Sequence, residues 1–145
     1  MVNQRQKFCS IHEDNSCVMC NTGADETIEH LFFICPFARQ CWTLINFNWN
    51  LSLNMEDRIK DAKHRNSQHF FTWTALIAAW ELWKIRDDKI FGRHDVCINR
   101  WVTNFKSQCH LQLIKFKADL RSAFCFWLDA FSVRLSELWL RPPYL

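Results

Sequence analysis

The stretch that decides the fold begins with Cys17-Val18-Met19-Cys20 and continues, after nine residues, with His30 and, after four more, with Cys35. Zinc is bound in proteins by cysteine thiolates and histidine nitrogens, and structural sites fill all four tetrahedral positions with such side chains. A Cys-x2-Cys pair supplies two thiolates from one tight turn, and the Gly23 that follows it tolerates the positive φ of such a turn. The four residues therefore predict a structural zinc site.

The range 26–34 is predicted to form a short helix that carries His30. Asp25 is a candidate N-cap, and two glutamates in the first turn suit the positive end of the helix dipole. A residue before proline is pushed out of the α region, so the helix should end at Cys35, before Pro36. The Cys35 sulfur can then turn back toward His30.

Other interpretations of the same residues remain open. The cysteines could be small buried hydrophobic side chains, with His30 a hydrogen-bonded core histidine. A catalytic zinc would keep one position open and leave one of the four side chains unused. Cys41 and His12 are the two candidates to substitute as ligands.

The zinc ligands belong to a longer pattern: Cys17-x2-Cys20, then Glu26-Thr27-x2-His30-Leu31-Phe32-Phe33-x-Cys35-Pro36-Phe37-Ala38, then Trp42. This pattern resembles the zinc-binding domain that follows the reverse transcriptase in plant LINE-type (non-LTR) retrotransposon polyproteins. The resemblance implies a structural Zn²⁺ in a non-catalytic accessory domain, with a polymerase or an RNase H domain of the parent polyprotein as neighbours. Members of that family carry a helical segment before the first Cys-x2-Cys. Residues 1–16 are shorter than that segment, so the domain is expected to be truncated at its start.

Composition favours an all-α fold. The 145 residues include two glycines and three prolines, which suits long helices and disfavours the regular tight turns of an all-β protein. Hydrophobic residues make up 49% of the chain, enough for a core. Eight tryptophans and thirteen phenylalanines must either fill that core or lie exposed as a patch.

Charge and cysteine content limit which partners and which cellular compartment are expected. A net charge of +3 permits contact with RNA or DNA without arguing for it. The N-terminal residues Met1 to Arg5 are polar, which excludes a signal peptide there, and no apolar run reaches about 20 residues, so no membrane partner is expected. The cysteines outside the zinc site are then free thiols in an intracellular, reducing compartment, nuclear or cytoplasmic.

We expect four segments: a zinc-binding module over 1–50, a polar linker over 51–66, a helical hairpin over 67–131 and a C-terminal tail over 132–145. In the module, a second helix is predicted from Phe37 to Phe47, and Trp42 is expected to pack over the module rather than to bind a base. In the linker, Asn54 can cap a short helix that reaches Ala62. The linker is either solvated or a phosphate-binding patch.

The hairpin is predicted from two helices. Ser67 is a candidate N-cap for the first, which reaches Phe91 and ends at Gly92. Asp95 can cap the second, over 96–131, where apolar residues recur at i, i+3, i+4 and i+7 for more than nine turns. The short connection should fold the two into a long antiparallel pair.

Four basic residues of the second predicted helix cluster within about 60° on a helical wheel: Lys106, His110, Lys117 and Arg121. They form either a solvated basic face or a face that tracks the phosphates of a nucleic acid.

No catalytic arrangement is found in the sequence. Asp87 and Asp88 are adjacent and so point to different sides of a helix, and two glycines cannot build a phosphate-binding loop. The first hypothesis is therefore a non-enzymatic zinc-binding domain of a retrotransposon reverse transcriptase that helps to position RNA or DNA. One alternative is a protein-interaction scaffold whose aromatic helices pack against the polymerase or, by self-association, against a second copy. Another is a fragment of a decayed element without selected function.

Overall fold

The computed structural model describes residues 15–66 and 70–140, and its described part consists of helices joined by loops, without strands. The elements are the π-helical turn η1 (His30–Ile34), α2 (Pro36–Leu44), α3 (Met55–Arg65), α4 (Phe71–Ile90), α5 (Ile98–Gln112), the 3₁₀ turn η2 (Leu113–Lys115) and α6 (Ala118–Leu140). An isolated antiparallel bridge between Ser16 and Asp25 is the one β-type pairing in these residues. The all-α prediction is confirmed.

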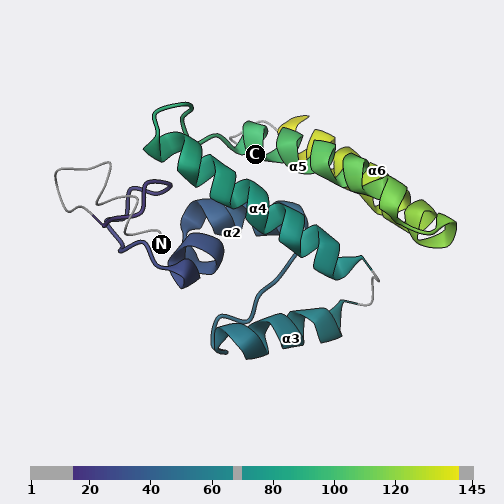
Figure 1. The fold of residues 1–145 in the computed structure, drawn as a ribbon, viewed down its shortest axis with the longest axis horizontal. Helices are drawn as coiled ribbons and strands as arrows, with labels where there is room; N and C mark the ends of the chain where they lie inside the picture. The colour runs from purple at the N-terminus through teal and green to yellow at the C-terminus, as the bar shows by residue number, and fades with distance from the viewer. Residues whose placement is uncertain (1–14, 67–69, 141–145) are drawn as a thin grey trace.

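Helix α4 lies at the centre of the arrangement (Figure 1). Helix α5 runs antiparallel along it, as predicted for this pair, while α2 packs against both α4 and α5, and η1 packs on α2. Helix α6 folds back along α5, and α3 lies apart from the other helices, below α4 in this view. None of the helices in the described ranges is both long enough and apolar enough to span a membrane.

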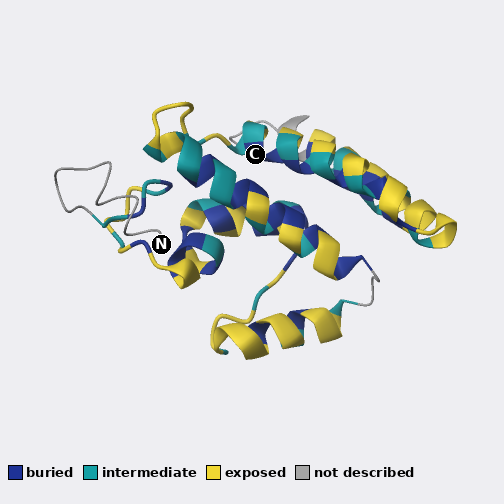
Figure 2. Ribbon diagram, in the orientation of Figure 1, coloured by how far each residue is buried: buried dark blue, intermediate teal, exposed yellow. Residues whose placement is uncertain are grey.

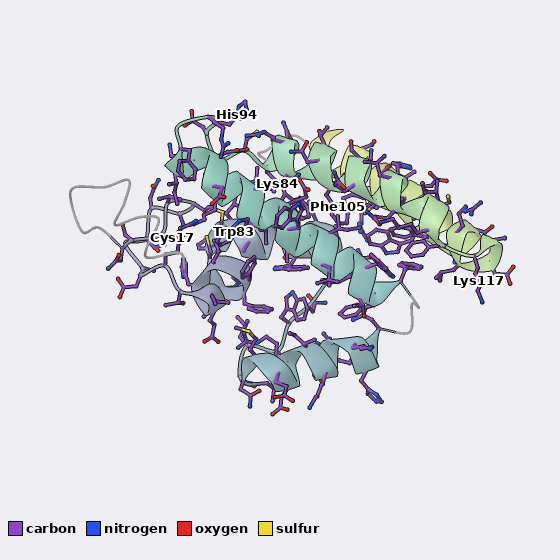
Figure 3. All side chains as sticks on the ribbon, in the orientation of Figure 1. Cys17, Trp83, Lys84, His94, Phe105 and Lys117 are labelled. Carbon is purple, nitrogen blue, oxygen red and sulfur yellow. The ribbon has the colours of Figure 1, made fainter. Side chains whose placement is uncertain are left out.

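A cluster of aromatic side chains fills the core between α4, α5 and α6. Trp101 is fully buried, donates its indole N–H to the carbonyl oxygen of Ala78 at 3.3 Å, and stacks on Phe105 at 5.1 Å between ring centroids. Phe105, labelled at the centre of Figure 3, meets Phe131 of α6 edge-on at 5.7 Å. Phe70, at the start of α4, packs on Phe124 of α6 at 4.8 Å. These contacts hold the three helices together.

The prediction of one helix over 96–131 is wrong. The chain turns over 113–117, and α6 returns along α5. A straight helix of that range would be about 54 Å long, whereas the 20 residues of α4 span about 30 Å, so its second half would have nothing to pack on. The turn is stabilised by Arg121, which donates to the carbonyl oxygens of Leu113 and Phe116 at 3.2 and 3.0 Å.

Helix ends were predicted with mixed success. Asn54 caps α3 as expected, accepting from the Asp57 amide at 2.9 Å, and Gly92 ends α4 with a φ of +67°. Asp95 does not cap α5, which begins at Ile98; its carboxylate pairs with Lys89 instead. The candidate cap Ser67 lies outside the described residues.

The four-segment division stays a prediction. The range 51–66 contains α3, which is exposed along most of its length (Figure 2), and α6 continues to Leu140, into the range assigned to a tail.

Candidate metal centre

The first two ligands sit on a tight turn of the backbone. The Cys17 amide donates to the carbonyl oxygen of Ala24 at 2.8 Å, so the chain reverses direction between them. Gly23 adopts a φ of +77°, a left-handed conformation that confirms the expectation for this position. Thr22 accepts the Ala24 amide on its hydroxyl at 3.3 Å, and the same hydroxyl lies 3.2 Å from the Cys20 sulfur. The turn thus brings both thiols to one side.

The other two ligands flank a π-helical turn. Thr27, rather than the predicted Asp25, caps this segment, because its hydroxyl accepts the His30 amide at 3.0 Å. The Cys35 amide then donates to the carbonyl oxygen of His30 at 2.7 Å, a bond across five residues. Single π turns are frequent at functional sites. Here the wide turn ends the helix at Cys35, as predicted from Pro36.

The four ligand atoms converge. The Sγ atoms of Cys17, Cys20 and Cys35 and one ring nitrogen of His30 all lie within 4.8 Å of one another. Cys17 Sγ and Cys35 Sγ are 3.8 Å apart, and Cys20 Sγ and His30 Nε2 are 3.4 Å apart. A tetrahedral zinc with bonds of about 2.3 Å to sulfur and about 2.0 Å to nitrogen requires edges of about 3.8 and about 3.5 Å. The donor set and its spacing therefore fit zinc.

The environment favours ionisation of one thiol at the site. The Cys17 thiol donates toward Cys35, which lowers the pKa of Cys35 against the opposing effect of its burial. Backbone N–H groups of Phe37 and Ala38, at the N-terminus of α2, lower the pKa of Cys35 further. The same contact and burial raise the pKa of Cys17. Zinc would bind both as thiolates, because a bound metal displaces the thiol proton.

A buried ion pair anchors the metal-binding segment to α4. The guanidinium of Arg86 donates through Nε to Glu26 Oε1 at 2.8 Å, and neither side chain is exposed. The Arg86 guanidinium also lies 4.9 Å from the ring centre of Trp83. The sequence offered no signal for a pair of residues 60 positions apart, and it assigned Glu26 to a helix N-terminus. The pair fixes the Cys17–Cys20 turn and the start of η1 against the central helix.

A second arginine ties η1 to the segment before α3. Arg58 is 1% exposed, donates to Glu29 at 2.7 Å and to the carbonyl oxygen of Leu53 at 2.8 Å, and lies over the ring of Phe33. Sequence reasoning placed Arg58 in a solvated or phosphate-binding linker. Its burial explains why α3 stays attached although most of its surface is exposed.

Three further residues were singled out near the site from the sequence: Cys41, Trp42 and His12. Cys41 is fully buried and lies outside the four-residue cluster, and burial raises its pKa. Trp42 donates its indole N–H to the carbonyl oxygen of Phe32 at 2.6 Å and stacks on Phe47, so it packs over the module as expected. His12 lies outside the described residues.

The four basic residues do not share one helix face. Lys106 and His110 lie on α5, whereas Lys117 and Arg121 follow the turn, and Arg121 stabilises that turn. In Figure 3, Lys117 lies at the end of the molecule opposite to Cys17. Their part in nucleic-acid binding stays a prediction.

The free thiols differ in accessibility. Cys97 is exposed, whereas Cys109 is fully buried, and burial, with the nearby Glu81 carboxylate, raises the pKa of Cys109 to about 12. At a pH of about 8, only about one Cys109 in ten thousand is then a thiolate, the nucleophilic form. We expect iodoacetamide to modify Cys97 at least a hundredfold faster than Cys109 in the zinc-loaded protein. Mass spectrometry of tryptic peptides over time measures both rates, and equal rates would contradict the burial of Cys109.

Comparison with known proteins agrees with the site. Residues 1–42 match a family model described as zinc-binding in reverse transcriptase. No curated protein and no solved structure matches the chain significantly. The match and the Cys17/Cys20/His30/Cys35 cluster together support a zinc-binding domain in the N-terminal part of the chain.

Proposed function

We propose, from the family match at residues 1–42, that this chain is a non-catalytic accessory domain whose structural zinc shapes a platform that positions RNA or DNA. The observation that carries the proposal is the convergence of three thiols and one imidazole within 4.8 Å. Zinc would cross-link the Cys17–Cys20 turn to η1 and α2. Because Glu26 is paired with Arg86, that cross-link would also set how the module sits on α4.

A groove between α5 and α6 supports contact with a phosphate backbone. It holds about 350 Å³ and is lined by Val102, Thr103, Lys106, Ser107, His110, Ser132, Leu135 and Ser136. Lysine ammonium groups and serine or threonine hydroxyls are common partners of phosphate oxygens. Two of the four basic residues singled out from the sequence thus share a groove with four hydroxyl groups. We assign nucleic-acid contact to Lys106 and His110, not to all four.

Binding to labelled single-stranded RNA and DNA tests this assignment. We expect affinity to fall as salt is raised, and Lys106→Ala to reduce the slope of log affinity against log salt by about 1, because one phosphate contact is lost. Fluorescence anisotropy at several salt concentrations measures both quantities.

Lys60→Ala is the matched control. Lys60 is exposed on α3 and pairs with Glu56 of the same helix at 2.7 Å, far from the α5–α6 groove in sequence. Its replacement should leave the salt slope unchanged. Binding that ignores salt, or that Lys60→Ala and Lys106→Ala weaken equally, would refute the assigned groove.

The same proposal includes the evolutionary origin of the chain and its cellular location. The residues that resemble plant LINE-type elements, including the Glu-Thr-x2-His-Leu-Phe run at Glu26–Phe32, are those that build η1 and the zinc site. This supports descent from such a polyprotein, with a polymerase or RNase H domain as partner. Zinc-binding thiolates also need a reducing compartment, which supports a nuclear or cytoplasmic location.

A further inference from the structure

An apolar groove lies between α3 and α4. It holds about 330 Å³, and its lining residues come from η1 and the chain around it, α2, α3 and α4. Among its lining residues, Trp49 packs edge-on against Phe33 and against Trp42, with ring centroids 5.1 and 5.0 Å apart. We call this feature the α3–α4 groove.

Large apolar side chains are exposed on its walls. Ile28 is 58% exposed, Met55 37%, Ile59 44% and Leu76 61%. Single exposed apolar residues are normal, but a contiguous group around a groove is characteristic of a binding surface. The group extends along α4 through Trp73 and Trp80, which line a neighbouring hollow together with Leu76.

The chemistry of the walls selects the kind of partner. Apart from Lys63, Thr72 and two tryptophan indoles, the side chains that line the α3–α4 groove are apolar. The Trp42 indole donates to the carbonyl oxygen of Phe32, whereas the buried Trp49 indole N–H has no partner among the described residues. An extended peptide or a nucleobase would leave polar groups unpaired against such walls, which is costly. An α-helix satisfies its own backbone groups, so it is the element that an apolar groove accepts.

The shape of the walls suits a helix as well. On α3, the side chains toward the groove are Met55, Ile59 and Lys63, spaced i, i+4 and i+8. On α4, the small residues Ala75 and Ala79 lie one turn apart on the wall, which lets another helix approach closely.

A charged side chain on the groove wall places a further requirement on the partner. Lys63 is the one charged side chain among the described residues that line the α3–α4 groove. The other lysine and arginine side chains of α3 have carboxylate partners, in the pairs Arg58–Glu29, Lys60–Glu56 and Arg65–Asp61. No ion pair is found for Lys63 in the described part of the chain, so it is placed to meet a carboxylate of the partner.

We propose that the α3–α4 groove binds an amphipathic helix of a partner protein, whose apolar side chains at i, i+3, i+4 and i+7 enter the groove and whose acidic residue pairs with Lys63. The α3–α4 groove shares no lining residue with the α5–α6 groove that holds Lys106 and His110, so the two contacts can be tested separately.

A synthetic helical peptide of about 15 residues, with leucines at i, i+3, i+4 and i+7 and a glutamate flanking them, is the probe. We expect saturable binding by isothermal titration calorimetry that Leu76→Glu weakens at least tenfold. Leu111→Glu is the matched control, because Leu111 is also 61% exposed but lies on α5 outside the groove. Zinc content and far-UV circular dichroism of both variants establish that they fold.

A charge swap tests the orientation of the bound helix. A peptide with lysine in place of the glutamate should bind the wild-type chain several-fold more weakly, and Lys63→Glu should restore its affinity. Binding unaffected by Leu76→Glu, or no binding of either peptide, would overturn the proposal. So would a concentration-dependent dimer that Leu76→Glu abolishes, since it would assign the groove to a second copy, or displacement of the peptide by single-stranded RNA.

Discussion

Replacing Cys35 by alanine is expected to abolish zinc binding and to unfold the N-terminal module. Cys35 supplies one of four converging ligand atoms and also joins η1 to α2. Structural zinc contributes about 10–16 kcal/mol of apparent binding free energy near neutral pH, more than a small module gains from its own core. Elemental analysis should find one zinc per wild-type chain and less than a tenth of that in Cys35→Ala.

Hydrogen exchange followed by mass spectrometry shows where structure is lost. Amides of residues 15–44 should exchange as in an unfolded chain. Helices α4, α5 and α6 should keep their structure, because aromatic contacts such as Trp101–Phe105, Phe105–Phe131 and Phe70–Phe124 join them without residues of the module. Cys97→Ala is the control, since Cys97 is exposed and outside the cluster. Wild-type protein that is purified under reducing conditions and holds no zinc would refute the metal site.

Breaking the Glu26–Arg86 pair is expected to destabilise the zinc-loaded protein by about 3–5 kcal/mol. Both side chains are fully buried, so Arg86→Met leaves the Glu26 carboxylate without its partner in a low-dielectric environment. Glu26→Leu should cost a similar amount for the converse reason. Guanidinium denaturation, followed by circular dichroism, measures the free energy of unfolding.

The double variant Glu26→Leu/Arg86→Met tests whether the two single variants lose stability through the same ion pair or through two unrelated contacts. Removing both charges should recover most of the lost stability, because no unpaired charge then remains. The control Arg93→Met removes an exposed arginine that pairs with Asp88 at 3.2 Å and should cost less than about 1 kcal/mol. Additive costs in the double variant would mean that Arg86 acts through Trp83 or Asp87 instead.

The Cys/His cluster could be predicted because its information is local. Cys17, Cys20, His30 and Cys35 lie within nineteen residues, and the turn at Gly23 and the helix end before Pro36 follow from backbone preferences of single residues. The cap was assigned to Asp25 instead of Thr27 because both residue types cap helices.

The break at 113–117 could not be predicted from the helical pattern. Residues on either side keep an i, i+3, i+4 repeat because Phe105, Phe124 and Phe131 all face one shared core, whether or not the helix bends between them. The turn contains neither glycine nor proline, so local preference does not mark it.

By itself the sequence determined which Cys and His side chains cluster as candidate metal ligands, the all-α class, the Asn54 cap and the end of α4 at Gly92, because each depends on a residue's own chemistry or on its near neighbours. Only the tertiary structure decided that α6 folds back, that Glu26 and Arg86 meet across 60 positions, and that Met55, Ile59 and Leu76 stay exposed around one groove. These outcomes depend on which surfaces find partners when helices of unequal length pack, and that competition is not encoded in any single stretch of the chain.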